Sequence, residues 1–214
     1  MPSAKTVARL TLYGDSISGN CLKARWTADL LAIEYDWVEV DILQGGTQSE
    51  DFLALNPVGQ VPLARWPDGR VLPQSNAIIL YLAELAGSDL IPADPFGRAQ
   101  MMSWLFWEQY SHETAIAVRR FQKHYLKTPE SEIDPDLLPK GRRALGVMEM
   151  QLTYTDWLVG EVMTLADIAL VAYTRVAHEG GFDLSEFPSV ERWVSRTESA
   201  LGIAHAMPHE GEAL

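Results

Sequence analysis

The first half of the chain alternates short apolar runs with segments in which apolar residues recur at helical spacing. Period-two alternation or flanking turn residues predict four strands, at residues 8–13, 35–43, 61–66 and 70–72. Helical spacing and capping residues predict a helix at 21–33, a short one that opens with a capping box at Thr47, and one capped by Ser75 or Asn76. The predicted order is strand, helix, strand, helix, then a hairpin and a final helix.

The second half is predicted to be helical throughout. Long helical patterns cover residues 98–127 and 137–158, and the last helix runs from Pro188 to Leu201. Between them, Thr164 and Asp167 form a start signal for a buried helix at 168–177.

The order of elements in the first half is that of a thioredoxin-like fold. The segment 87–96 carries Gly, Ser, Asp and two prolines and reads as a linker. The sequence therefore predicts a thioredoxin-like α/β domain at residues 1–86 and an all-α domain at 97–214.

Composition narrows the functional classes. The 214 residues carry a formal net charge of −12, which disfavours nucleic acid and anionic membranes as partners because it repels phosphate. No stretch reaches the roughly 20 apolar residues of a membrane span, and the N-terminus lacks the apolar run of a signal peptide. The single cysteine, Cys21, excludes an internal disulfide and a cysteine-based zinc site, so we expect a cytoplasmic protein.

The junction between the first strand and the first helix is the first candidate site. Free backbone N–H groups and the positive end of the helix dipole stabilise a thiolate there, and Ser18 and Asn20 add a hydroxyl and an amide. An unperturbed thiol has a pKa of about 8.5. To lower that pKa by one unit, a site has to stabilise the thiolate relative to the thiol by about 1.4 kcal/mol. Taken alone, however, Ser18 is better explained as an ordinary helix cap.

Two further features are weak in isolation. Gln74 and Ser75 precede a helix directly after a strand, where a helix start can receive a carboxylate or simply be capped by serine. Val61-Pro62 opens a predicted strand, where a proline is explained by a sheet edge or by a cis peptide that presents the Val61 backbone to a peptide-like ligand.

Together with their neighbours, these features resemble the cytosolic glutathione transferase superfamily over essentially the whole chain. The matching segments are Leu12-Tyr13 with Ser18-Gly-Asn20, Phe52 to Pro62, Leu72 to Leu82, and Thr164 to Ile168. The resemblance is to bacterial members of the serine or asparagine type. It implies glutathione as co-substrate and a homodimer. The spacing of the histidines, in turn, predicts no metal.

The resemblance also implies roles for individual residues. Ser18 and Asn20 are expected to stabilise the glutathione thiolate, the Val61 backbone to pair with the cysteinyl part, and Gln74 and Ser75 to hold the γ-glutamyl end. Gln60 stands where relatives often have a lysine near the glycyl carboxylate, and Thr47 or Gln48 is expected to compensate. The catalytic tyrosine of tyrosine-type classes aligns with Gly14. Its neighbour Tyr13 would point to the opposite face of the strand and is therefore expected in the core. Cys21 is expected to be a buried structural thiol rather than a reactive one.

The second substrate is expected between the domains, against the long helix at 98–127. The candidates there are Phe106, Tyr110 and Arg119, with Trp107 and His112 beside them, although aromatic residues at helical spacing are more often core. Of the five histidines, only His205 and His209 are closely spaced, and we expect both in an exposed tail rather than at a metal.

The sequence thus predicts an enzyme that transfers glutathione to a hydrophobic electrophile. The alternatives are a glutathione-dependent disulfide reductase or isomerase, and a glutathione-binding module without catalysis.

Overall fold

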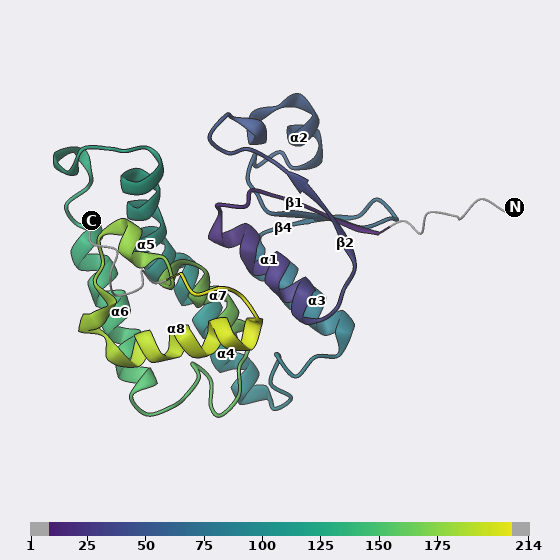
Figure 1. Cartoon of the computed structure of the whole chain (residues 1–214). Helices are drawn as coiled ribbons and strands as arrows, with labels where there is room; N and C mark the ends of the chain where they lie inside the picture. The colour runs from purple at the N-terminus through teal and green to yellow at the C-terminus, as the bar shows by residue number, and fades with distance from the viewer. Residues whose placement is uncertain (1–8, 207–214) are drawn as a thin grey trace, which may run out of the picture. The chain divides into compact units, whose positions relative to one another are not determined.

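The computed structural model describes residues 9–206, which divide into two compact units at the boundary between Ser88 and Asp89 (Figure 1). Ala8, the predicted start of the first strand, and His209 lie outside the described residues. Within the described range, no helix is both long and apolar enough to cross a membrane.

The first unit is a four-stranded mixed sheet with helices on both faces. The strands are β1 (Leu10–Gly14), β2 (Tyr35–Glu39), β3 (Leu63–Arg65) and β4 (Val71–Pro73). Their order is β2-β1-β3-β4, with β1 parallel to β2 and the other pairs antiparallel. The helices are α1 (Gly19–Leu30), α2 (Glu50–Leu55) and α3 (Ser75–Ala86), with a 3-10 turn, η1 (Gly46–Gln48), before α2. The predicted thioredoxin-like fold is confirmed.

Each face of this sheet buries its own apolar cluster. On one face α1 and α3 lie side by side and cover a cluster that includes Leu12, Ala24 and Ile78, while α2 lies on the opposite side of the sheet (Figure 1). Beneath α2, Phe52 and Leu63 are buried and Tyr13 packs against them. Because adjacent strand residues point to opposite faces, Leu12 and Tyr13 fall in different clusters. Tyr13 is partly buried against its cluster, in agreement with its predicted place in the core.

Several predicted element boundaries need correction in this unit. The second strand ends at Glu39, because Asp41 accepts hydrogen bonds from the backbone of Leu43 and Gln44 and turns the chain. The cap of α2 is Ser49, whose hydroxyl accepts from the Phe52 amide, so Thr47 belongs to the preceding 3-10 turn.

Another correction concerns α3. Its N-cap is Gln74, and Ser75 is the first helical residue instead of the cap. The hydroxyl of Ser75 is directed to another partner, Asn20 of α1, which explains why it does not cap its own helix. The first helix also starts earlier than predicted, at Gly19, so Cys21 lies in its first turn.

The second unit is mostly helical, as predicted. Its first helical run comprises α4 (Pro95–Trp107), the π-helical turn η2 (Glu108–His112), α5 (Glu113–Arg120) and a second π-helical turn, η3 (Phe121–Tyr125). The remaining helices are α6 (Leu137–Leu152), α7 (Leu165–Thr174) and α8 (Pro188–Leu201), joined by 3-10 turns η4 (Glu130–Glu132), η5 (Ala177–Gly180) and η6 (Leu184–Glu186).

Several boundaries differ from the sequence prediction here. The helix α7 spans Leu165–Thr174 instead of 168–177, because the capping box at Thr164 starts the helix directly after that residue. The helix α4 begins inside the predicted linker, because Asp94 caps it and Pro95 occupies the first turn, where a missing N–H costs nothing. The helix α6 ends at Leu152 instead of 158, since the chain turns away and the Leu158 amide donates to Asp167.

The helix α7 forms the centre of the second unit, and all ten of its residues are buried. The predicted start signal is a capping box: Thr164 Oγ1 accepts from the Ala166 amide, and Asp167 Oδ2 accepts from the Thr164 amide at 2.8 Å. Asp167 Oδ1 also accepts from the Leu158 amide and the Trp193 indole. This one buried carboxylate therefore ties the start of α7 to the preceding loop and to α8.

Candidate functional site

The strand register of the first unit brings three predicted site segments to one edge of the sheet. Tyr13 of β1 is opposite Leu63 of β3, and Leu63 is opposite Pro73 of β4. The residues that follow β1, precede β3 and follow β4 therefore meet at the same edge. These are the segments of Ser18, Val61 and Gln74, which lie far apart in the sequence.

Two carboxylates shape the loop between β1 and α1. The buried carboxylate of Asp15 accepts from the amides of Ile17 and Ile42, at 2.9 and 2.8 Å. Glu39 Oε1 accepts from both the amide and the hydroxyl of Ser16. A hydrogen bond from Trp37, and then those from Ser16, hold the pKa of Glu39 below its usual value. Because its hydroxyl already donates to Glu39, Ser16 is a structural part of the loop.

Ser18 lies at the N-cap of α1, half-buried, with its side chain making no capping hydrogen bond. Its neighbour Cys21 is fully buried. Burial raises the pKa of the Cys21 thiol from 9.0 to about 11, and a hydrogen bond with the Ser18 side chain opposes that rise. Cys21 is thus the buried thiol that the sequence predicts.

Asn20, in the first turn of α1, is half-buried and accepts hydrogen bonds from the buried side chains of Lys23 and Ser75. The Lys23 ammonium donates to Asn20 Oδ1 at 2.7 Å, and the Ser75 hydroxyl donates to the same oxygen at 2.9 Å. Since Asn20 and Ser75 are 55 positions apart, this contact joins the first turns of α1 and α3.

Gln74 has an unusual backbone conformation, with φ at +75° in a region that non-glycine residues rarely occupy. Such strain costs on the order of 1–3 kcal/mol and is commonly found at functional sites. Its side chain is exposed, while Ser75 behind it is buried. Gln74 therefore presents a polar side chain at the N-terminal end of α3.

The remaining glutathione-site candidates of the first unit lie around the loop from α2 to β3. Gln48 Nε2 donates to Thr47 Oγ1 and to the Gly59 carbonyl, and the Gln60 carbonyl accepts from Asn56. Gly59 has φ at +66°, a conformation that favours glycine, and a Cβ there would lie 2.7 Å from Gln48 Nε2 and would displace that side chain. The Val61-Pro62 peptide after it is cis, as the resemblance implied.

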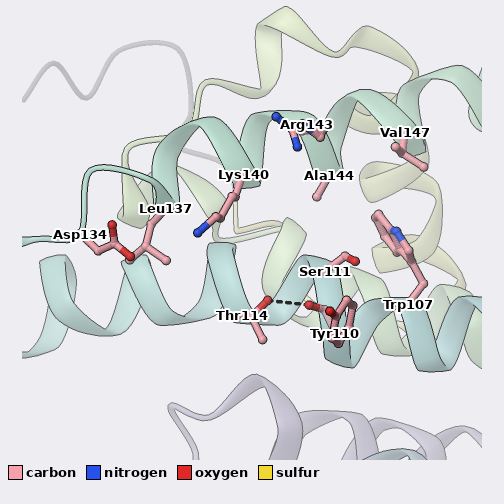
Figure 2. A pocket seen from close by; sticks show the side chains of 10 residues that line it. All are labelled: Trp107, Tyr110, Ser111, Thr114, Asp134, Leu137, Lys140, Arg143, Ala144 and Val147. Carbon is pink, nitrogen blue, oxygen red and sulfur yellow. Dashed lines mark hydrogen bonds between the residues drawn. The ribbon is translucent and has the colours of Figure 1, made fainter.

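A cavity of about 590 Å³ lies within the second unit, between the α4–η2–α5 run and α6 (Figure 2). Tyr110 and Trp107 line it from the first helical run, and Lys140 extends from α6 toward the helix that carries Thr114 (Figure 2). Tyr110 is 85% exposed. The cavity combines aromatic surface with cations, because Arg143 also lines it.

The other predicted second-substrate residues lie elsewhere. Arg119 is buried, donates to the Gly180 carbonyl at 2.8 Å and pairs with Glu130. His112 is buried with Nε2 2.9 Å from Thr174 Oγ1. Phe106 is 68% exposed and lines a separate, shallow hollow along α4. Of the predicted set, the structure brings only Trp107 and Tyr110 to the cavity.

Among residues 9–206, no group of three or more His, Cys, Asp or Glu side chains is arranged to hold a metal ion. His205 Nδ1 lies 2.7 Å from Glu198 Oε2, an ion pair when the imidazole is protonated.

The fold and the site together define a class of protein: a thioredoxin-like unit with convergent polar groups at one sheet edge, followed by a helical unit with an aromatic cavity. Family models agree. The model described as "Glutathione S-transferase, N-terminal domain" matches residues 17–85, and "Glutathione S-transferase, C-terminal domain" matches residues 105–200. The chain belongs to the glutathione S-transferase family.

Individual relatives cover most of the chain. Glutathione S-transferase GstB of Escherichia coli is 30% identical over 86% of this chain and 90% of its own length. The crystal structure of a glutathione S-transferase from Pseudomonas fluorescens is 46% identical, with a TM-score of 0.88, and covers 94% of this chain and 100% of its own. A glutathione S-transferase structure from Xanthobacter autotrophicus is 42% identical, with a TM-score of 0.85 over 94% of this chain and 98% of its own.

Sequence reasoning missed Lys23, Lys140 and Arg143. Helical spacing could have indicated Lys23, because it lies one turn after Asn20 on α1. Its neighbours Cys21 and Ala24 on the same helix are buried. Lys140 and Arg143 had none, because charges on a helix with helical apolar spacing are ordinarily solvated, and only the packing of α6 brings them to the cavity.

Proposed function

We propose that this chain conjugates glutathione to a hydrophobic electrophile, with the sulfur held where β1 meets α1. Membership of the glutathione S-transferase family supports the transferase reaction. The single observation that carries the placement of the sulfur is the convergence of Ser18, Asn20 and Ser75 at the N-terminal ends of α1 and α3.

The chemistry that this site offers is stabilisation of an anion. The first turn of the 12-residue α1 has backbone N–H groups without intrahelical acceptors, and the helix dipole adds a partial positive charge. In the proposed reaction the Ser18 hydroxyl and the Asn20 amide donate to the glutathione sulfur. The lowered thiol pKa supplies the nucleophile, and binding of both substrates supplies proximity.

Side chains around the β1–α1 junction favour a transferase of the serine or asparagine type over one with a catalytic tyrosine or cysteine. The position that aligns with the catalytic tyrosine of other classes is Gly14, and a Cβ there would lie 2.4 Å from the Trp37 ring. Cys21 is buried with a raised pKa, the opposite of an activated thiol. Ser16 donates to Glu39. These observations support Ser18 and Asn20 as the residues that face the sulfur.

The proposed binding mode distributes the rest of glutathione over the same sheet edge. The γ-glutamyl carboxylate meets the N-terminal end of α3 at Gln74 and Ser75, where a helix start favours an anion. The Val61 backbone pairs with the cysteinyl part. The glycyl end lies toward Thr47, Gln48 and Gln60, which the hydrogen bonds of the α2–β3 loop bring together.

For the second substrate we propose the cavity that Trp107 and Tyr110 line. Its aromatic surface suits an apolar body, and the Tyr110 hydroxyl is available for a hydrogen bond. The buried, ion-paired state of Arg119 supports a structural role for that residue instead.

We also propose that the chain works as a cytoplasmic homodimer, with the exposed Phe106 face of α4 at the interface. Sedimentation of the wild type and of the Phe106→Glu variant tests this proposal.

The thiolate absorbance of bound glutathione, recorded against pH, tests the proposed function. In the wild type we expect the thiol to titrate at least one unit below its free value. Ser18→Ala and Asn20→Ala should each raise that pKa and lower turnover of an electrophile. Normal glutathione binding with an unshifted thiol would contradict transferase catalysis at this site and favour a binding module.

A further inference from the structure

Lys23 is the one lysine among the fully buried large side chains that the structure describes, with 0% of its surface exposed. Lysine is rarely buried in full, because removing an ammonium from water is costly unless polar partners compensate. One of its partners is Asn20 Oδ1, at 2.7 Å, one helical turn before it on α1. The charge is therefore placed beside the proposed sulfur site without facing solvent.

The hydrogen-bonding chemistry of these groups fixes the orientation of the Asn20 amide. A lysine ammonium has three donors and no acceptor, so the Asn20 atom that it contacts has to be the oxygen. The Ser75 hydroxyl donates to the same oxygen at 2.9 Å. Rotating the amide by half a turn would place its NH₂ group against the ammonium, donor against donor. The Nδ2 donors are thereby directed away from Lys23 and Ser75.

We propose that Lys23 is a positioning residue of the glutathione site. By binding Asn20 Oδ1, it holds the amide in the orientation in which Nδ2 donates to the glutathione sulfur. Lys23 acts on the thiolate through Asn20 and does not bind the tripeptide. This inference rests on the proposed function, because it assumes that the sulfur lies at the start of α1.

Removing Lys23 tests the role, with the pKa of bound glutathione as the readout. Lys23→Met keeps an unbranched apolar side chain without the ammonium, and the Ser75 hydroxyl still donates to Asn20 Oδ1 in that variant. We expect the thiol pKa to rise by about one unit, a tenfold loss of thiolate below the pKa, while the dissociation constant for glutathione stays within about threefold. Lys23→Gln removes the charge but keeps an N–H donor and should restore part of the shift.

A double-mutant cycle distinguishes positioning from a direct effect of charge. If Lys23 acts through Asn20, Lys23→Met should leave the thiol pKa unchanged when Asn20 is already alanine. Arg65→Met removes an exposed cation from the same unit and serves as the control, with no expected shift.

Additive effects of the two substitutions would contradict the inference, as would equal pKa values for Lys23→Met and wild type. Loss of glutathione binding in Lys23→Met would also overturn it, because Lys23 would then hold the tripeptide itself. Failure of the proposed function is recognised separately, by an unshifted thiol pKa in the wild type.

Discussion

The buried carboxylate of Asp167 should dominate the stability of the helical unit. It is fully buried and accepts from the amides of Leu158 and Thr164 and from the Trp193 indole, at 3.0, 2.8 and 2.8 Å. Asp167→Ala would leave these three donors without their acceptor. A buried donor that loses its partner costs about 1–3 kcal/mol. Allowing for water that enters the space left, we expect a loss of about 3–5 kcal/mol of unfolding free energy.

Urea denaturation measures this loss, and Asp94→Ala is the matched control. Asp94 also caps a helix, α4, but it is exposed and accepts a hydrogen bond from the Gly97 amide. Loss of such a cap typically costs about 1 kcal/mol. Asp167→Asn keeps one oxygen acceptor and should fall between the two. The reasoning is refuted if Asp167→Ala costs no more than Asp94→Ala.

Three further predictions concern single residues. At pH 8, a pKa of about 11 leaves roughly one Cys21 thiol in a thousand ionised. Alkylation of Cys21 by iodoacetamide should therefore be at least about a hundredfold slower in the native protein than in urea. Equal rates in the two conditions would disprove the burial of Cys21. Gly59→Ala should lower the free energy of unfolding, measured in urea, by about 1–3 kcal/mol, because alanine is strained at a positive φ. It should also weaken glutathione binding in calorimetry, because the added Cβ displaces the Gln48 side chain. Unchanged binding would show that this loop is not part of the glutathione site. Arg119→Met should lower the free energy of unfolding by about 1–2 kcal/mol, since the Gly180 carbonyl loses its hydrogen-bond donor. The KM for the electrophile should stay unchanged. A raised KM would show that Arg119 does belong to the second-substrate site.

Local chemistry made the fold and part of the site predictable from the sequence. The capping box of α7 was predicted, although not the first helical residue, because the Thr164–Asp167 pair satisfies helix N–H groups within four residues. Tyr13 was correctly placed in the core, because alternation along β1 puts it on the face opposite Leu12.

Contacts between distant segments explain what the sequence did not predict. Ser75 or Asn76 was expected to cap the helix at 75–86, but the Ser75 hydroxyl donates to Asn20, a contact that depends on α1 and α3 lying side by side. Arg119 was considered for the second-substrate site, yet whether an arginine faces a ligand or an ion pair depends on where Gly180 and Glu130 fall in the fold. No spacing rule contains that information.

A crystal structure of the protein with glutathione tests the central claim most directly. The account predicts the sulfur within hydrogen-bonding distance of the Ser18 hydroxyl and the Asn20 amide nitrogen, with the γ-glutamyl carboxylate at the start of α3. Glutathione bound with its sulfur away from the first turn of α1 would contradict it.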